Sequence, residues 1–576
     1  PWDKLQMEEE KWFAGKDEDI VNAPNQAARK KKIAALEQSN PTLFAEFIAA
    51  GQSIASDSCF VKNSGRFPLT AVGKLELSSL FAELCLSFSK EAWGLVLPTG
   101  IAVNDSNKAF FSKLIDENRL MSLYDFENRE GLFDIHRMFK FCLLTAGKAQ
   151  AEPRTVNGGF YLTRIDHLLD PNRIYTLRTD DFALLNPNTK TCPVFRTSRD
   201  ARLTTKIYHR CKVLMNDVTS ENPWKIRFCG TFNMATDSDL FRTYAQLKEV
   251  GAEYKAPNFV FNGEIYVPLY EGKMIWYYNH HFGTWPTLGE RPNTISTPPL
   301  AELADPNSFI MPWYWVPLSE VKSRLMKTDK DGNIVWEWKY NWLFSFRKLT
   351  NATNERTFVL STMPGTVGAG DSTTLLCTEH GTIPGALLLA MLSSLTLDYI
   401  VRQKVGGSNL SHFFLKQFPV LIPGQIPDKV KPYIIERVAE LCYFNHDLDG
   451  WMCELWNDKA MTDDIRTALL ARLSECNGLG LDSDSLAAPD FTKMQPYIYN
   501  EPRRAVAQAE LDAIFAHLYG LTTEELHYIL DPEDVCGKGC INETFRVLRD
   551  NEIRQYGEYR TKRLVLEAWN RFGFDN

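Results

Sequence analysis

The spacing of apolar residues changes between helical and strand-like several times within the first 150 residues. Residues 74–90 carry apolar side chains at three- and four-residue intervals, which predicts an amphipathic helix. Residues 93–98 form a short, continuous apolar run, which predicts a buried parallel strand before a functional loop. Further helices are predicted over 30–36, 41–50 and 108–118, and further strands over 120–126 and 139–145. This alternation is typical of an α/β fold, of which the chain holds only part.

Beyond residue 147 the pattern becomes loop-rich and then helical. Short strand-like runs are predicted over 159–164, 259–268, 274–278 and 358–362. A long apolar helix is predicted over 386–404, closed by Gly406 and Gly407, and helices are predicted over 432–443, 463–475, 505–519 and 523–530. The pattern therefore predicts an α/β domain over 1–150, a mixed α/β region over 151–425 and a helical region over 426–576.

Composition narrows the class of protein. The 576 residues are 44% hydrophobic and 24% charged, which excludes a disordered or fibrous chain. Polar residues interrupt the apolar stretch 386–401, so no transmembrane helix is predicted. Twelve scattered cysteines favour a reducing, cytoplasmic setting over a disulfide framework. With a net charge of −8, any binding to nucleic acid must come from local basic patches.

A series of short motifs follows in a fixed order along nearly the whole chain. These are Pro1-Trp2, Gly73-Lys74, 94–101 (GLVLPTGI), 124–133 (YDFENREGLF), 139–141, Pro223-Trp224, 232–243, 268–274 (PLYEGKM), 347–356 and 558–563. Their order resembles that of large N6-adenine DNA methyltransferases from restriction-modification and phage-defence systems, such as type IIG, BREX and DISARM. The resemblance is specific for the family and names no DNA target sequence.

The resemblance implies catalytic roles for Pro1 and Trp2. They match the last two positions of the family's Asn-Pro-Pro-aromatic motif, whose Asn and first Pro bind the amine of a flipped adenine. Trp2 is then expected to stack on the base while S-adenosylmethionine donates the methyl group, a contact worth about 1 to 3 kcal/mol. Taken without the family, Trp2 is better explained as a core aromatic at a chain end, and the resemblance reverses that preference.

The resemblance also implies a fold. The expected architecture is the carboxy-terminal half of a Rossmann-like class I methyltransferase fold, followed by a target-recognition region and a helical region. The cofactor half is expected upstream of Pro1, and no cofactor-binding residue is assigned here. Residues 367–370 (VGAG) are interpreted as a turn rather than a nucleotide loop. If Pro1 is a native terminus, the alternative is a non-catalytic DNA-recognition or adaptor subunit of a defence complex.

Two groups of residues are candidates for contact with double-stranded DNA. Arg199, Arg202, Lys206 and Arg210 recur at helical spacing, so one helix face could track phosphates, or could simply be a solvated charged face. A second group surrounds the Gly406-Gly407 loop and either reads base edges or belongs to the scaffold. Its members are Arg402, Lys404, Asn409, His412 and Lys416.

No metal site is expected. His280 and His281 are adjacent, but no carboxylate or cysteine lies at ligand spacing, so the pair is interpreted as part of a polar loop. The expected partners are DNA, the upstream methyltransferase segment and other subunits of a defence system, with no membrane.

Overall fold

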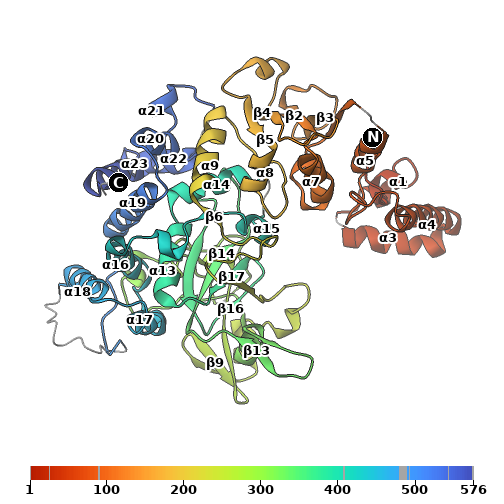
Figure 1. The fold of residues 1–576 in the computed structure, drawn as a ribbon. Helices are drawn as coiled ribbons and strands as arrows, with labels where there is room; N and C mark the ends of the chain where they lie inside the picture. Colours follow the sequence, from red (N-terminus) through yellow and green to blue (C-terminus); the bar gives the residue numbers. More distant parts are fainter. Residues whose placement is uncertain are drawn as a thin grey trace. The chain divides into compact units, whose positions relative to one another are not determined.

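The computed structural model describes residues 2–24, 26–88, 91–287, 289–405, 409–478, 490–491, 493–541 and 544–573. The chain has a mixed α/β architecture (Figure 1) and divides into two compact units, Pro1–Arg202 and Leu203–Asn576. The boundary of the first unit lies beyond the residue 150 expected from the sequence, because β4 (Thr155–Leu162) and β5 (Tyr175–Arg178) complete its sheet.

The first unit is built on a five-stranded sheet with the order β1-β3-β2-β4-β5. Its first three strands are β1 (Ala92–Pro98), β2 (Leu120–Glu127) and β3 (Lys140–Gly147), as the apolar runs predicted. Strand β3 is antiparallel to both β1 and β2, and β2 is parallel to β4. Strands β1, β2 and β4 therefore run in the same direction, and their carboxyl ends lie at one edge of the sheet.

The prediction of a buried strand at 93–98 is wrong. Among the described strands β1 pairs only with β3, so it lies at an edge, and its residues alternate between exposed and half-buried up to Leu97. An edge strand shields one side of its backbone only, which leaves Val96 exposed despite the apolar sequence.

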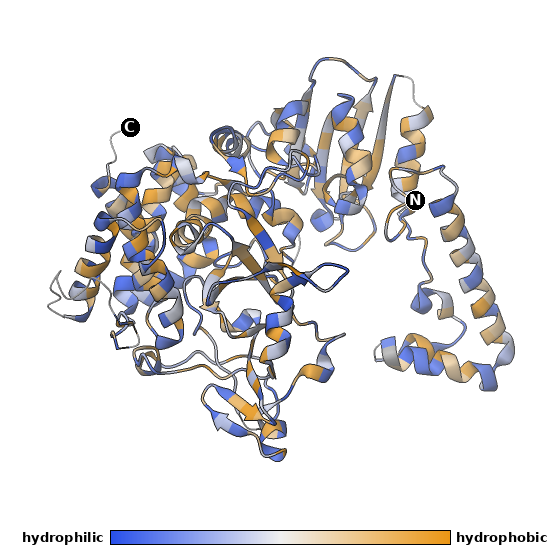
Figure 2. Ribbon diagram, turned by 60° about the horizontal axis from the view of Figure 1, so that its bottom comes forward, coloured by the Kyte–Doolittle hydropathy of each residue, from blue (hydrophilic) through white to orange (hydrophobic). Residues whose placement is uncertain are grey.

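Helices form the rest of the first unit. They are α1 (Glu9–Phe13), α2 (Glu18–Val21), α3 (Gln26–Ser39), α4 (Pro41–Asn63), α5 (Leu77–Phe88), α6 (Gly100–Val103), α7 (Lys108–Asp116), α8 (Thr179–Leu185) and the first part of α9 (Ser198–Arg210). Asn40 caps α4 by accepting a 3.2 Å hydrogen bond from the Leu43 amide. None of the residues of α4 is buried, and hydrophobic and hydrophilic residues are mixed along it (Figure 2). By contrast α7 buries Phe110, Phe111 and Leu114 completely.

The second unit holds four small sheets. Their orders are β11-β10-β9-β8 with β16 beside β10, β12-β13, β15-β14-β17-β7 and β18-β6. The strands are β6 (Lys212–Val213), β7 (Ile226–Cys229), β8 (Glu253–Lys255), β9 (Asn258–Phe261), β10 (Glu264–Tyr270), β11 (Trp315–Pro317), β12 (Met326–Thr328), β13 (Ile334–Glu337), β14 (Trp342–Arg347), β15 (Leu360–Pro364), β16 (Gly368–Ala369), β17 (Thr373–Thr378) and β18 (Pro419–Val420). The predicted strand at 274–278 is wrong, because the Trp276 amide bonds to the Asn279 carbonyl and the chain turns back.

Helices make up much of the second unit. They are α10 (Tyr244–Glu249), α11 (Leu300–Leu303), α12 (Leu318–Arg324), α13 (Thr382–Leu392), α14 (Leu395–Lys404), α15 (His412–Leu415), α16 (Lys431–Cys442), α17 (Asp449–Trp456), α18 (Asp463–Asn477), α19 (Glu501–Leu518), α20 (Thr523–Leu530), α21 (Glu533–Cys536), α22 (Arg546–Tyr556) and α23 (Arg560–Arg571). The helices predicted after residue 429 are confirmed.

The single helix predicted over 386–404 is instead two helices, α13 and α14. The Ser394 hydroxyl accepts a 3.3 Å hydrogen bond from the Leu397 amide, so it caps a new helix in the middle of the apolar run. Its expected end at Gly406 and Gly407 lies outside the described residues. Within the described ranges no single helix is long and apolar enough to cross a membrane, although α13 and α14 together pass that test with a 63° bend between them.

Candidate functional site

Three polar or aromatic residues meet at the carboxyl ends of the parallel strands in the first unit. Thr99 directly follows β1. Asp125 lies two residues before the end of β2, and Tyr161 lies one residue before the end of β4. Ligands of open α/β sheets bind beyond the carboxyl ends of the strands. This edge is therefore the candidate functional site of the first unit, and we call it the carboxyl edge.

Asp125 is the buried centre of the carboxyl edge, with 1% of its surface exposed. The Thr99 hydroxyl donates a short hydrogen bond to one carboxylate oxygen, and the Tyr161 amide donates a 3.3 Å bond to the other. Burial raises the pKa of Asp125, while the bond from Thr99 and the positive charge of Lys140 oppose that rise. The carboxylate thus ties the ends of three strands together.

Trp2 lies beside the same edge. Its indole N–H donates a 3.0 Å hydrogen bond to the Val96 carbonyl of β1. Its ring stacks on Phe139 with 5.4 Å between centroids and 7° between planes, and it borders a core of Phe126, Phe141 and Leu162. The ring is half-buried, and Pro1 lies outside the described residues. These contacts are packing contacts, and the stacking of Trp2 on a base stays a prediction.

The four basic residues predicted to share a helix face lie on α9. Arg202 is exposed, and neither a hydrogen bond nor an ion pair joins its side chain to any residue within the described ranges. Lys206 pairs with Glu525 at 2.5 Å, and the Arg210 guanidinium donates a 2.8 Å bond to the Leu518 carbonyl. Arg199 is half-buried. The helical spacing is confirmed, whereas contact with DNA stays a prediction.

The structure places Arg402 in the protein interior, with 8% of its surface exposed. Its guanidinium pairs with Asp398 at 3.0 Å and donates to four backbone carbonyls, those of Ala352, Asn354, Glu355 and Thr544. Every donor direction is thus used inside the chain. These contacts hold the loop before Thr357 against α14, so we leave Arg402 out of the proposed DNA interface.

The other residues of that group lie at or near the surface. Lys404 sits 5.0 Å over the ring of Tyr208, and burial lowers its pKa to about 7. Asn409 is exposed and forms an isolated bridge with Leu349. Lys416 is half-buried and pairs with Asp217 at 2.7 Å. Asn409 and His412 are therefore the exposed members of this group, whereas Lys404 and Lys416 are half-buried.

His280 and His281 were expected in a polar loop without a carboxylate, and that expectation is wrong. Both imidazoles are 1% exposed, and each Nε2 lies 2.8 Å from a different oxygen of Asp447. Asp447 is 166 residues away from His281, so no local sequence pattern predicts that it contacts the two histidines. All three ligand atoms lie within 4.8 Å of one another, but hydrogen bonds already occupy them. A pocket of about 370 Å³ adjoins His281 and Asp447.

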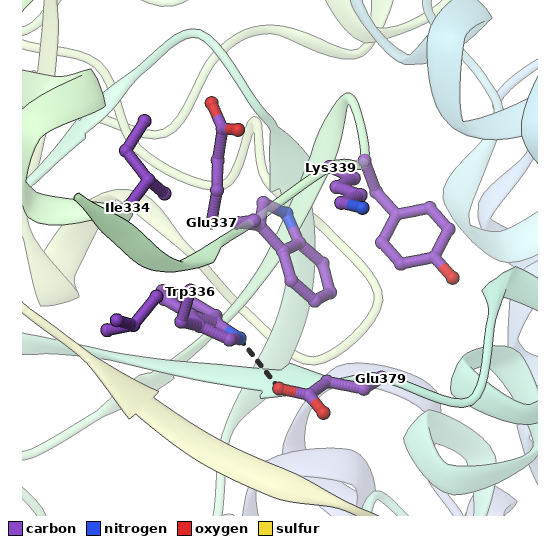
Figure 3. Close-up of a pocket in the computed structure, with 8 residues that line it drawn as sticks. Ile334, Trp336, Glu337, Lys339 and Glu379 are labelled. Carbon is purple, nitrogen blue, oxygen red and sulfur yellow. Dashed lines mark hydrogen bonds between the residues drawn. The ribbon is translucent and has the colours of Figure 1, made fainter. Parts of the chain in front are cut away.

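A second pocket of about 460 Å³ lies beside the β12–β13 hairpin (Figure 3). The Trp336 indole points toward Glu379 and donates a 2.6 Å hydrogen bond to it. Arg227 lies 4.7 Å over the Trp336 ring and pairs with Glu379 at 3.2 Å. The remaining lining residues are Ile334, Val335, Glu337, Trp338, Lys339 and Tyr340. This is an aromatic surface on which Glu379 is already paired with Arg227, and Glu337 and Lys339 add further charges.

The glycine segment 367–370 does not fit a nucleotide. Gly368 and Ala369 form the short strand β16 beside β10, and a Cβ at Gly368 would lie only 2.7 Å from Val316. The turn expected over 367–370 is therefore wrong beyond Val367, because Gly368 and Ala369 form a strand and Gly370 forms a bridge with Phe232. We therefore assign no phosphate site to this segment.

Sequence reasoning did not single out Thr99, Asp125, Tyr161 or Arg196 as site residues. A signal was present for Tyr161, because Gly158 and Gly159 precede it inside a strand pattern and glycines there often mark a bulge. Asp125 is harder to find, because an acidic residue in a strand looks solvent-facing until the neighbouring strands are known.

Known proteins resemble this chain only at the level of solved structures. No family model and no curated protein matches the chain. Several solved structures match parts of it, among them two restriction-modification enzymes. The type IIG restriction endonuclease BpuSI matches with 15% identity and a TM-score of 0.23 over 70% of this chain and 49% of its own. The type IIL restriction-modification enzyme MmeI in complex with DNA matches with 10% identity and a TM-score of 0.30 over 72% and 51%.

The chain spans about half the length of these two enzymes. Both TM-scores are below 0.5.

Proposed function

We propose that this chain is part of a site-specific DNA adenine-N6 methyltransferase of a bacterial restriction-modification or anti-phage system. Its first unit would supply the second half of a Rossmann-like catalytic domain, and the rest of the chain would bind and recognise double-stranded DNA. The methyl donor would be S-adenosylmethionine, held by a segment upstream of Pro1. The enzyme would flip the target adenine out of the duplex.

The position of Trp2 is the observation that supports this proposal best. The ring lies beside β1 near its carboxyl end, because β3 begins opposite the end of β1 and Phe139 directly precedes β3. That edge is where open α/β sheets bind their ligands. An aromatic ring placed there can stack on a base extruded from the duplex.

The chain's own residues would do three things at this edge. Trp2 would stack on the flipped adenine and orient its exocyclic amine. Asp125, tied to Thr99 and Tyr161, would fix the ends of the strands and so hold the aromatic residues in place. The aromatic side chains around Trp2 would exclude water from the amine. S-adenosylmethionine supplies an electrophilic methyl group when bound.

The proposed DNA contacts divide into two classes. The exposed Arg202 on α9 would bind a phosphate, with Arg199 and Arg210 on the same helix adding positive charge, and Lys206 would contribute less because it pairs with Glu525. Asn409, with Lys404 and Lys416 nearby, would contact base edges. Phosphate contacts position a protein on DNA, whereas base contacts specify the sequence.

A second candidate function is a non-catalytic DNA-recognition or adaptor subunit. One observation favours it, since the Trp2 ring already stacks on Phe139 and its N–H is already bonded to Val96. Such a subunit would need the DNA contacts without the methyl donor.

Methyl transfer to DNA decides between the two functions. The full-length protein is incubated with S-adenosylmethionine labelled in its methyl group and with DNA, which is then digested to nucleosides. Label in N6-methyldeoxyadenosine supports the methyltransferase. Binding to DNA without any labelled nucleoside supports the adaptor and rules out the methyltransferase.

A further inference from the structure

Strand β4 carries a bulge directly opposite Asp125. Tyr124 of β2 pairs with Gly159, but Phe126 pairs with Leu162, so β4 has one residue more than β2 in this interval. The extra residue puts Tyr161 at φ = 57°, in the left-handed region that a bulky residue rarely adopts. Bulges beside functional sites turn a side chain in a new direction.

The protein maintains this conformation with a buried charge. A bulge leaves an amide without a partner in the sheet, and here the Tyr161 amide bonds to the Asp125 carboxylate at 3.3 Å. A left-handed bulky residue persists only where the surroundings fix it, and such residues cluster at ligand sites. The buried carboxylate and its bond to Thr99 supply that restraint.

The bulge brings the Tyr161 ring under two cations. The Arg196 guanidinium lies 4.0 Å from the ring centroid, and the Lys140 ammonium lies 4.5 Å from it. Lys140 pairs with Glu127 at 3.1 Å, and Arg129 contacts the same carboxylate at 2.6 Å. Arg196 makes no ion pair with any residue that the structure describes, and it is half-buried.

An arginine that lies over an aromatic ring keeps its N–H donors available. Cation–π contact satisfies the face of the guanidinium but not its N–H groups. The segment before Arg196 is fixed, because the Cys192 amide bonds to the Ala102 carbonyl at 2.9 Å. A planar fork of N–H donors with no carboxylate partner matches the two oxygens of a phosphate.

We propose that Arg196, supported on the ring of Tyr161, binds a backbone phosphate of DNA at the carboxyl edge of the first unit. The contact lies on the same sheet edge as Trp2, so it would hold the strand that carries the target base. This inference rests on the proposed function, since it takes double-stranded DNA as the ligand.

The salt dependence of DNA binding tests the inference. Affinity of the full-length protein for a fluorescein-labelled duplex is measured by anisotropy over a series of NaCl concentrations. Arg196→Gln should reduce affinity at least about tenfold. The negative slope of log K against log salt should become shallower by about 0.9. Tyr161→Leu, which removes the ring, should also reduce affinity, and Tyr161→Phe should restore it.

Arg178→Gln is the matched control, because Arg178 is an exposed arginine of the same unit that already pairs with Asp180 at 3.1 Å. It removes the same charge and should leave the slope unchanged. If Arg196→Gln lowers the melting temperature, Arg196→Lys decides, because it keeps the charge but loses the fork. Weaker DNA binding by Arg196→Lys, at an unchanged salt slope, then supports the contact between Arg196 and a phosphate.

The outcomes separate the inference from the proposed function. An unchanged slope and affinity in Arg196→Gln, or in Arg196→Lys where that variant decides, overturns the inference alone. A slope that falls equally in Arg178→Gln also overturns it, because the effect is then one of net charge. Failure of the wild-type protein to bind DNA overturns the proposed function and the inference with it.

Discussion

The indole of Trp2 stacks on the ring of Phe139 with their planes 7° apart. We expect Trp2→Ala to lower the free energy of unfolding by about 2 kcal/mol, roughly half the cost for a fully buried Trp, because the ring is half-buried. If Trp2 also stacks on the flipped base, the methylation rate of the folded variant should fall by about 5- to 150-fold. Urea unfolding and single-turnover methylation measure the two effects.

Two further variants separate packing from base stacking. Trp2→Phe keeps an aromatic face and should lose much less activity than Trp2→Ala. Phe139→Leu removes the ring beneath Trp2 but leaves Trp2 in place, so it should lower stability more than activity. Normal methylation by folded Trp2→Ala would remove Trp2 from the active site.

Local patterns predicted most of the elements that surround the site. Apolar spacing predicted α7 and α16, because a helix that packs on one side repeats its buried residues every three or four positions, and the spacing of four basic residues predicted α9. Apolar spacing could not predict the break between α13 and α14, because almost every residue of both helices is buried. There the cap formed by Ser394 decides where a helix begins.

The chemistry of the sites was less predictable than the elements. Asp447 joins His280 and His281 from a distant segment, and Asp125 acquires its role only when β4 bulges beside it. Arg402 shows the opposite error, since a basic residue near a glycine loop looked like a DNA ligand and is instead a buried partner of Asp398. Ion pairs between distant residues have no periodicity to detect.

We expect Arg402→Ala to destabilise the protein by about 3 to 5 kcal/mol, because it leaves the Asp398 carboxylate buried without its cation. The exposed Arg563, which pairs with Glu558 at 3.0 Å, is the control, and Arg563→Ala should cost less than about 1 kcal/mol. Urea unfolding of both variants provides the comparison. Equal small losses would show that the interior contacts of Arg402 contribute little.

The stability of the protein should fall in acid in two stages. Burial lowers the pKa of His280, so the unfolded chain binds more protons and stability falls as the pH drops below about 6.5. Burial raises the pKa of Asp447, but attraction to His280 and His281 lowers it by more. The contribution of Asp447 to the free energy of unfolding is therefore present above about pH 3.9 and is lost as the pH falls below that value.

Asp447→Asn tests the two stages separately. Without the carboxylate the pKa of His280 should fall further, since only Asp447 among its neighbours raises it, and the loss of stability below about pH 6.5 should become steeper. The stage below about pH 3.9 should shrink. Urea midpoints measured from acid to neutral pH report both, and an unaltered pH profile would contradict the coupling of His280 to Asp447.

Arg202 and Lys206 are one helical turn apart on α9, yet they should behave differently. Arg202 is exposed without a partner among the described residues, whereas Lys206 is paired with Glu525 at 2.5 Å. Arg202→Ala should weaken binding to all DNA sequences alike and lower the salt slope by about 0.9, with unfolding unchanged. Lys206→Ala should change the slope less and cost below about 1 kcal/mol of stability, because its charge is already neutralised. Anisotropy titrations and urea unfolding of both variants measure this, and an unchanged slope in Arg202→Ala would assign this face of α9 to solvent.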